Sequence, residues 1–223
     1  MTFIHEPVQL GYDNLKTENV DGKRMYVTPA GQKFPSVTTV LGVNSKKAIM
    51  EWRKRVGEEE ANRISSFAAS RGTRVHTMVE RYLDNRDDYL EKSNPLTKAN
   101  FSRIQKVLDE RLSKVILQEA PLFSEHLSLA GRVDCVGVFD GKISIIDFKT
   151  SAKPKKHDWI HNYFMQETAY AIAFEERTDI PVLRLVTIIV NDVDDEAQVF
   201  IERRDDWVKP LFDTIERYHL ESV

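Results

Sequence analysis

The sequence predicts an α/β fold: a mixed β-sheet flanked by helices and preceded by a helical region. Two observations lead to this prediction. Apolar residues recur at helical spacing over much of residues 37–118, whereas residues 119–203 contain five strand-like runs with one helical segment between the third and fourth. No Gly-, Ser- or Pro-rich linker separates these parts. We therefore expect one domain over residues 1–223, with the N-terminal hairpin and helices in 1–118 and the sheet core in 119–223.

The N-terminal part begins with a short hairpin over residues 23–35, turning at Pro29-Ala30-Gly31. Ser36 is placed to cap a short helix that opens with VTTVL. Residues 46–85 are helical in pattern, with expected interruptions near Gly57 and at Ser70-Arg71-Gly72. A further helix is predicted over residues 97–118.

In the second half, residues 119–131 alternate as a strand that includes Glu125, and a hairpin over residues 131–151 follows. Residues 158–177 are predicted to be helical. The remaining elements are two strands and a closing helix, at residues 182–191, 197–203 and 205–220.

Composition limits the class of protein. The 223 residues are 41% hydrophobic and 30% charged, which suits a sizeable core beneath a polar surface. The formal net charge of −3 excludes a generally basic surface, so a polyanion would be held by local basic patches or by bound metal. Cys135 is the single cysteine, the first residues lack a secretory pattern, and no apolar run approaches the about 20 residues of a membrane span. We expect an intracellular, cytoplasmic protein without a membrane segment.

The hairpin at residues 131–151 carries charges where a core strand pair should be apolar. Asp140-Gly141 is a strong two-residue turn signal, so Phe139 should face Lys142. The same register places Asp134 opposite Asp147, with Cβ atoms about 5 Å apart. Lys149 is two residues further along and points to the same side.

Two opposed carboxylates in an apolar sheet repel each other, and desolvation adds to the cost. A shared proton, an ion pair with Lys149 or a divalent cation would relieve the repulsion. Oxygen ligands of this kind suit Mg²⁺ or Mn²⁺. The alternative is a buried Asp–Lys pair that only fixes strand register, which leaves the second aspartate unpaired.

The segment GRVDCVG with Asp147-Phe148-Lys149 resembles the divided acid–acid–lysine motif of the PD-(D/E)xK nucleases, in the form typical of the RecB-type branch. Val133 stands where the motif nominally has proline. The resemblance implies a restriction-endonuclease-like fold and a metal-dependent nuclease. It also implies that Asp134, Asp147 and the Phe148 backbone carbonyl hold the ion while Lys149 positions the attacking water.

Three more segments extend the resemblance. RGTRVH supplies His76 as a metal ligand, and QETAY supplies Gln166 and Tyr170 as further catalytic residues. Glu125 is the acid upstream of the hairpin that would add a metal contact. Each has a plain alternative: a half-buried helix residue for His76, helix packing for Gln166 and Tyr170, and a solvent-exposed edge position for Glu125.

KFPSVTTVL resembles the N-terminal element of the group that contains mitochondrial genome maintenance exonucleases and phage exonucleases. The resemblance points to DNA as the partner, and the candidate nucleic-acid contacts are basic or hydroxyl residues near the motifs: Ser36, Thr38, Arg71, Arg74, Thr150, Ser151, Lys153, Lys155 and Lys156. Basic clusters of this kind are also common on solvated surfaces.

The sequence thus predicts a Mg²⁺- or Mn²⁺-dependent DNA nuclease. The preference for single-stranded ends or flaps, a phage origin, and replication or recombination partners are implied by the resemblance alone. A catalytically inactive DNA-binding module and a metal-free carboxylate-pair hydrolase are the alternatives. His157 and His161 have the i, i+4 spacing of a zinc site, but the sequence shows no evident third ligand, so no zinc is expected.

Overall fold

The centre of the molecule is a mixed β-sheet. The computed structural model describes residues 2–91 and 93–221. Over these residues one sheet has six strands in the order β1-β5-β6-β7-β8-β9, and only β1–β5 and β7–β8 pair in parallel. Its strands are β1 (Ile4–His5), β5 (Leu112–Ser124), β6 (Leu129–Phe139), β7 (Lys142–Ser151), β8 (Arg184–Asn191) and β9 (Gln198–Arg203).

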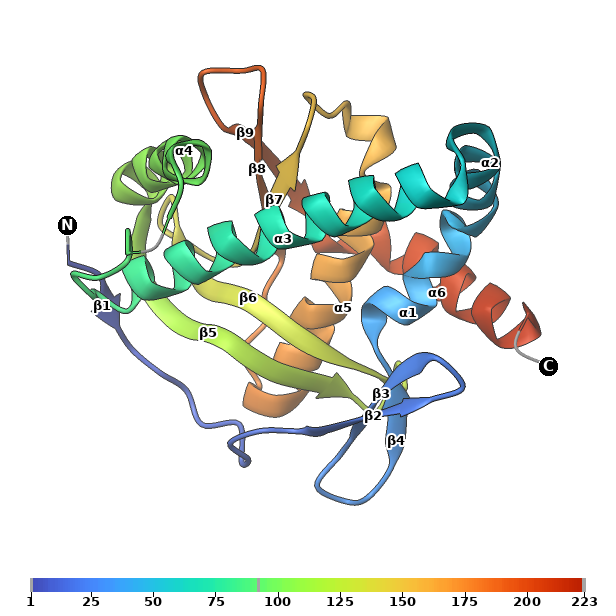
Figure 1. Ribbon diagram of the computed structural model, residues 1–223. Coiled ribbons are helices and arrows are strands. Elements are labelled where there is room, and N and C mark those ends of the chain that lie inside the picture. Colours follow the sequence, from blue (N-terminus) through green and yellow to red (C-terminus); the bar gives the residue numbers. More distant parts are fainter. Residues whose placement is uncertain (1, 92, 222–223) are drawn as a thin grey trace.

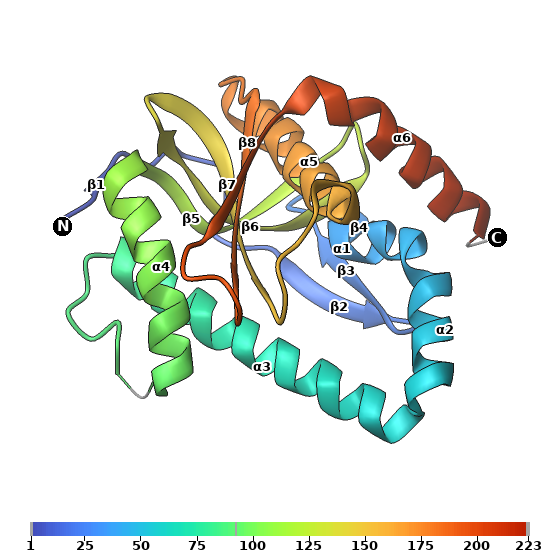
Figure 2. The ribbon, with the colours of Figure 1, turned by 90° about the horizontal axis from the view of Figure 1, so that it is seen from above.

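Helices cover both faces of this sheet, as Figures 1 and 2 show. On one face, α3 (Glu58–Leu83) and α4 (Pro95–Arg111) pack on a core that includes Phe101, Phe139 and Phe148. On the other face, α1 (Val37–Leu41), α5 (His161–Thr178) and α6 (Arg204–Glu221) share a core with Phe164 and Phe174. The predicted mixed α/β architecture is confirmed.

The helix α5 connects β7 to β8, because two parallel neighbouring strands need a long crossover. This crossover brings Gln166 against Asp147 of β7 and Tyr170 against Gly131 of β6. The arrangement is important for the site, since the chain passes from the acid–lysine strand directly into the helix that supports it.

The N-terminal region forms a second, smaller sheet and a helical arm. Strands β2 (Lys16–Val20), β3 (Lys23–Val27) and β4 (Lys33–Pro35) pair antiparallel, which confirms the hairpin at 23–35 and adds a strand before it. Ser36 caps α1, as predicted: its Oγ accepts a hydrogen bond from the Thr39 backbone N–H at 3.1 Å. The helix α2 (Lys46–Val56) ends at Gly57, whose φ of 88° favours glycine.

Two boundary predictions were wrong. The helix α3 runs without a break through Ser70-Arg71-Gly72, because one glycine costs a helix only about 1 kcal/mol and the buried residues that follow, such as Val75 and Val79, hold the helix on the sheet. The helix predicted to reach residue 118 ends at Arg111, and β5 begins at Leu112. The apolar run Val115–Leu117 fits either period, and pairing with β6 decides it in favour of a strand. None of the described helices is long and apolar enough to cross a membrane.

Candidate active site

The acid–lysine hairpin has the register that the sequence predicted, up to one point. Phe139 pairs with Lys142, and the described β6–β7 ladder continues to the pair Cys135–Ile146. Beyond it the strands separate, and β7 continues beside β8 instead. The expected backbone pair of Asp134 with Asp147 therefore does not form. The Asp134 carboxylate lies in the opening and accepts a hydrogen bond from the Phe148 backbone N–H at 2.9 Å.

Asp147 is almost fully buried beside this opening. Its Oδ1 accepts a hydrogen bond from Gln166 Nε2 at 3.0 Å, and its Oδ2 forms an ion pair with Lys149. Burial raises the pKa of Asp147, while Lys149 lowers it and Asp134 raises it further. A positive charge nearby stabilises the ionised form of a carboxyl group that is buried in this way.

Lys149 is the positive charge that the site supplies itself. Burial opposes ionisation of its ammonium, but the Asp147 and Asp134 carboxylates outweigh that effect and raise the pKa of Lys149. The ammonium also lies over the Tyr163 ring, with Nζ 5.1 Å from the ring centroid. Lys149 is therefore protonated and held in place from two sides.

His76 on α3 reaches the same opening. Its Nδ1 lies 3.6 Å from Asp134 Oδ2, and its ring meets the edge of Phe148. The prediction that His76 joins Asp134 in space agrees with this geometry. One ligand atom each from His76, Asp134 and Glu119 lie within 4.8 Å of one another.

Glu119 is the acid of this group that the sequence reasoning did not single out. It lies on β5 between the ladder pairs Gln118–Cys135 and Ala120–Val133, which puts it across from Asp134. Its φ of 44° is unusual for a residue with a side chain and occurs within a strand. Burial raises the pKa of Glu119 to about 7, and the charge of Asp134 adds to the shift.

A divalent cation fits this donor set. Two carboxylates and one imidazole converge, those of Glu119, Asp134 and His76. Burial raises the pKa values of Glu119 and of the neighbouring Asp147, and the charge of Asp134 adds to both shifts. Mg²⁺ and Mn²⁺ take such oxygen ligands, and Mn²⁺ accepts an imidazole as well. The site residues that would hold the ion are His76, Glu119 and Asp134, with Asp147 beside them.

Glu125 is not part of this group. It lies in the turn after β5 rather than in the predicted strand, six residues beyond Glu119. Its side chain is exposed, with Oε1 4.0 Å from Arg177 Nη1. Strand β5 begins earlier than expected and ends at Ser124. Glu119, near its centre, therefore faces Asp134, whereas Glu125 lies beyond its end.

Tyr170 is buried, and its ring packs against Gly131 of the hairpin. A Cβ atom at Gly131 would lie 2.7 Å from both Cε1 and Oη of Tyr170, so the bare glycine makes room for the ring. Burial raises the pKa of Tyr170 well above that of a free tyrosine, and Asp134 and Asp147 contribute. Tyr170 is thus close to the carboxylates but covered by the protein.

The helix α5 contributes a further acid, Glu167, close enough to Asp147 to be affected by its charge. Glu167 is fully buried, and its carboxyl contacts the Thr187 hydroxyl on β8. Burial raises its pKa well above the ordinary value, and the charge of Asp147 adds to this effect. Glu167 and Tyr163 were not predicted; their spacing with Gln166 and Tyr170 on one helix is the signal that could have indicated them.

Two of the residues predicted to bind nucleic acid have internal partners. Arg71 is buried, and its Nη1 forms an ion pair with Asp192 Oδ2 at 2.5 Å, which joins α3 to the β8–β9 connection. Ser36 is buried as the cap of α1. Their first role is structural, and contact with nucleic acid would require these bonds to be shared or replaced.

The other predicted contacts are exposed or half-buried, except Ser151, which is buried. Arg74, Thr38, Lys153 and Lys156 are at least partly exposed. Lys155 is half-buried, and Gln198 holds its backbone through two hydrogen bonds of 2.7 and 2.9 Å. Thr150 is half-buried beneath Gly72 of α3, and the buried Ser151 hydroxyl donates to the Lys153 carbonyl at 2.7 Å.

Comparison with known proteins agrees with this geometry. Residues 49–218 match the PD-(D/E)XK nuclease superfamily. The human mitochondrial genome maintenance exonuclease 1 is 31% identical over 158 residues, which cover 66% of this chain and 45% of that protein. The mouse protein of the same name is 29% identical over 130 residues, which cover 55% of this chain and 38% of that protein.

The chain spans less than half the length of these curated relatives. Among solved structures, one described as the crystal structure of SSO0001 aligns with 64% of this chain and 74% of its own, at 16% identity and a TM-score of 0.29.

Proposed function

This chain belongs to the PD-(D/E)XK nuclease superfamily, and from that premise we propose that it is a Mg²⁺- or Mn²⁺-dependent deoxyribonuclease that acts as an exonuclease on single-stranded ends or flaps. The observation that carries the proposal is the opening between β6 and β7. There His76, Glu119 and Asp134 converge next to the buried Asp147–Lys149 pair. A merely structural ion pair would not require the other three groups.

The protein residues divide the work of phosphodiester hydrolysis. His76, Glu119 and Asp134 would hold the divalent ion. Asp147 and the Phe148 carbonyl are the further ligands that the family resemblance adds. When bound, such an ion stabilises the charge that develops on the phosphate. Lys149 is protonated, so it acts as a hydrogen-bond donor that positions the attacking water or a phosphate oxygen.

Gln166 and Tyr163 are positioning residues in this proposal. The Gln166 amide holds one oxygen of Asp147, and the Tyr163 ring supports the Lys149 ammonium. Both come from α5, whose own packing against the sheet is extensive. The ammonium and carboxylate are therefore oriented before a substrate arrives, which lowers the cost of ordering them during the reaction.

DNA as substrate is supported by the surface beside the site. Lys153 and Lys156 lie on the loop that leaves the Lys149 strand, and Trp159 follows them with 65% of its surface exposed. Lys156 Nζ lies 5.2 Å from the Trp159 ring centroid. Phosphates bind such lysines, and an unpaired base stacks on an exposed indole, which favours a single strand. The curated relatives named above are called exonucleases.

Cleavage of end-labelled single- and double-stranded DNA tests the proposal. The reactions contain Mg²⁺, Mn²⁺ or EDTA, and compare the wild type with Lys149→Met, Asp134→Asn and the control Lys209→Met. We expect metal-dependent cleavage of single strands and a loss of about 10²–10³-fold in Lys149→Met, the scale of one removed transition-state donor. Lys209→Met removes the same charge from an exposed position on α6 and should keep most of the rate.

Three outcomes would contradict parts of the proposal. Cleavage in EDTA, or full activity of Lys149→Met, contradicts the mechanism. Binding without any cleavage identifies a catalytically inactive DNA-binding module. Cleavage of a circular single strand as fast as a linear one shows an endonuclease rather than an exonuclease.

A further inference from the structure

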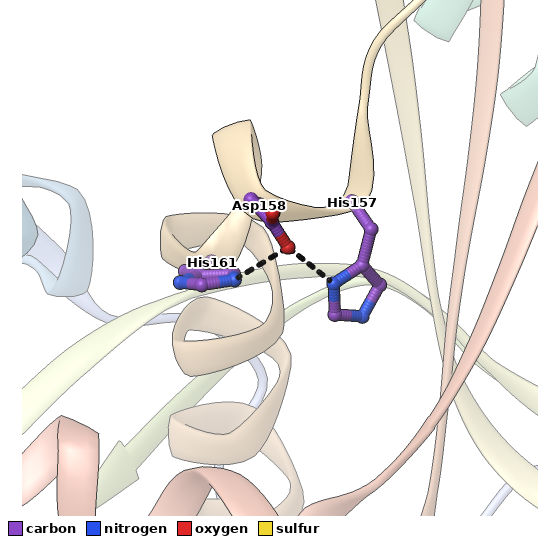
Figure 3. A group of neighbouring side chains, drawn as sticks. All are labelled: His157, Asp158 and His161. Carbon is purple, nitrogen blue, oxygen red and sulfur yellow. Dashed lines mark hydrogen bonds and ion pairs between the residues drawn. The ribbon is translucent and has the colours of Figure 1, made fainter.

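A second group of metal-binding side chains lies at the start of α5, outside the nuclease site. The 3₁₀ turn His157–Trp159 precedes this helix and brings His157, Asp158 and His161 together. Figure 3 shows the Asp158 carboxylate between the two imidazoles. Asp158 Oδ1 lies 3.4 Å from His157 Nδ1 and 4.0 Å from His161 Nε2.

We propose that His157 Nδ1, Asp158 Oδ1 and His161 Nε2 form a binding site for a transition-metal dication of the Zn²⁺ class. Asp158 is the third ligand that the spacing of the two histidines alone did not reveal. Two neutral imidazoles and one carboxylate are the donors that Zn²⁺ prefers at sites with three protein ligands and one open position. This set differs from the carboxylate-rich nuclease site, where Mg²⁺ and Mn²⁺ fit better.

The distances suit a tetrahedral ion. Metal–ligand bonds of about 2.0–2.1 Å place two ligand atoms about 3.3–3.4 Å apart at the tetrahedral angle. The His157–Asp158 separation already has this value, and the His161–Asp158 separation exceeds it by an amount that a small side-chain rotation closes. All three side chains are exposed, so the fourth position faces solvent and is open to a water molecule or an outside ligand.

The surroundings of the histidines hold them in the required orientation. His157 Nε2 lies 2.8 Å from Glu202 Oε1 on β9, and Trp207 Nε1 donates to the other oxygen of Glu202 at 3.1 Å. A proton on Nε2 leaves Nδ1 free to bind a metal, and a carboxylate behind a histidine is the usual second partner at metal sites. The His161 ring packs on Trp207, with centroids 4.8 Å apart.

A bound ion would connect the loop that follows β7 to the elements next to it. The ion would join the 3₁₀ turn to the first turn of α5, and the Glu202 contact extends the connection to β9. An ion that binds the folded chain and not the unfolded one stabilises the fold by mass action. Zn²⁺ binding should therefore raise the melting temperature.

The test compares Zn²⁺ stoichiometry and thermal stability in tag-free protein at about pH 8. The variants are Asp158→Ala, His161→Gln and, as a matched control, His219→Gln on α6. Asp158 is 87% exposed, so its substitution should leave the fold intact. Each measurement is repeated in an Asp134→Asn background, which separates any Zn²⁺ bound by His76, Glu119 and Asp134 from Zn²⁺ bound at the start of α5.

We expect the wild type and His219→Gln to bind one more equivalent of Zn²⁺ than Asp158→Ala and His161→Gln, in both backgrounds. The Zn²⁺-induced rise in melting temperature in the Asp134→Asn background should disappear in the same two variants. Equal stoichiometry and an equal rise in all four proteins would overturn the proposal. Because neither readout depends on DNA cleavage, this result is distinct from failure of the proposed nuclease function.

Discussion

Two glycines near the site, Gly131 and Gly72, differ in whether a larger side chain would fit at their positions. A Cβ at Gly131 would meet the buried Tyr170 ring at 2.7 Å, a distance that real side chains do not tolerate. A Cβ at Gly72 on α3 would meet only Thr150 Oγ1, at an ordinary 3.8 Å. The first glycine is needed for packing inside the protein. The second is not.

Gly131→Ala should therefore destabilise the protein by about 1–3 kcal/mol, the usual cost of overpacking a filled core. Tyr170 cannot move away easily, because it is enclosed between α5 and β6. Urea denaturation of the metal-free protein measures the change. Gly72→Ala is the matched control, and it should stabilise α3 by up to about 1 kcal/mol, since alanine replaces glycine within a helix. Equal stability of the two variants would contradict the assignment.

At the scale of elements, β6 and β7 carry Asp134 and Asp147 but do not stay paired along their full length, as the strands of an ordinary hairpin do. β6 remains with β5, β7 remains with β8, and the site occupies the place where they part. Elements from both faces close this opening, α3 with His76 from one side and α5 with Gln166 from the other. The separation exposes the Phe148 backbone N–H to the Asp134 carboxylate, so a strand irregularity becomes part of the site.

The short helix α1 gives a test at this scale, because Ser36 was predicted to bind nucleic acid but caps the helix. Ser36→Ala should lower the free energy of unfolding by about 1 kcal/mol through loss of the cap. DNA affinity, measured by fluorescence anisotropy well below the melting temperature, should stay unchanged. Thr38→Ala alters an exposed neighbouring hydroxyl and should change stability little. A loss of affinity in Ser36→Ala without a loss of stability would instead support a direct role of Ser36 in DNA binding.

A feature of this fold could be predicted from sequence when the residues that produce it lie close together in the chain. The Asp140-Gly141 turn determines the hairpin register as far as the pair Cys135–Ile146. The sequence therefore indicated that Asp134, Asp147 and Lys149 lie near one another, but not that the two strands separate before the Asp134–Asp147 pair. Glu119 could not be placed in this way, because β5 contains two register shifts that periodicity does not reveal. The Arg71–Asp192 pair joins residues 121 positions apart, and its formation depends on the complete tertiary fold.

At the scale of the whole molecule, a net charge of −3 means that DNA binding depends on a local patch. Lys153→Ala combined with Lys156→Ala should weaken binding to single-stranded DNA. It should also reduce the slope of log affinity against log salt concentration by about 0.7 for each phosphate that the variant no longer neutralises. Lys209→Ala on α6 removes an exposed lysine elsewhere and should leave the slope unchanged. Titrations across a salt series measure this, and an unchanged slope in the double variant would place the DNA on another surface.

The crowding of carboxyl groups makes a prediction about the stability of the entire metal-free fold. Burial raises the pKa of Glu119 to about 7 from an ordinary value of 4.5, and the pKa of Glu167 is raised as well. The folded state then binds more protons than the unfolded state as pH rises from 4.5 to about 7, so stability falls across that window. The full Glu119 shift corresponds to about 3 kcal/mol, and because this side chain is partly exposed we expect about 1–2 kcal/mol.

In EDTA, the melting temperature of the wild type should therefore decrease between about pH 5 and pH 8. Glu119→Gln should flatten this decrease, since the amide has no proton to lose, whereas Glu125→Gln in the exposed turn should not. Mg²⁺ or Mn²⁺ should restore more stability to the wild type at the upper pH than to Glu119→Gln, because the ion binds the ionised carboxylate. If the pH profile of Glu119→Gln matches that of the wild type in EDTA, the charge that destabilises the apo protein lies elsewhere. Glu167→Gln is then the next variant to measure, since it removes a fully buried acid whose pKa is also raised by burial.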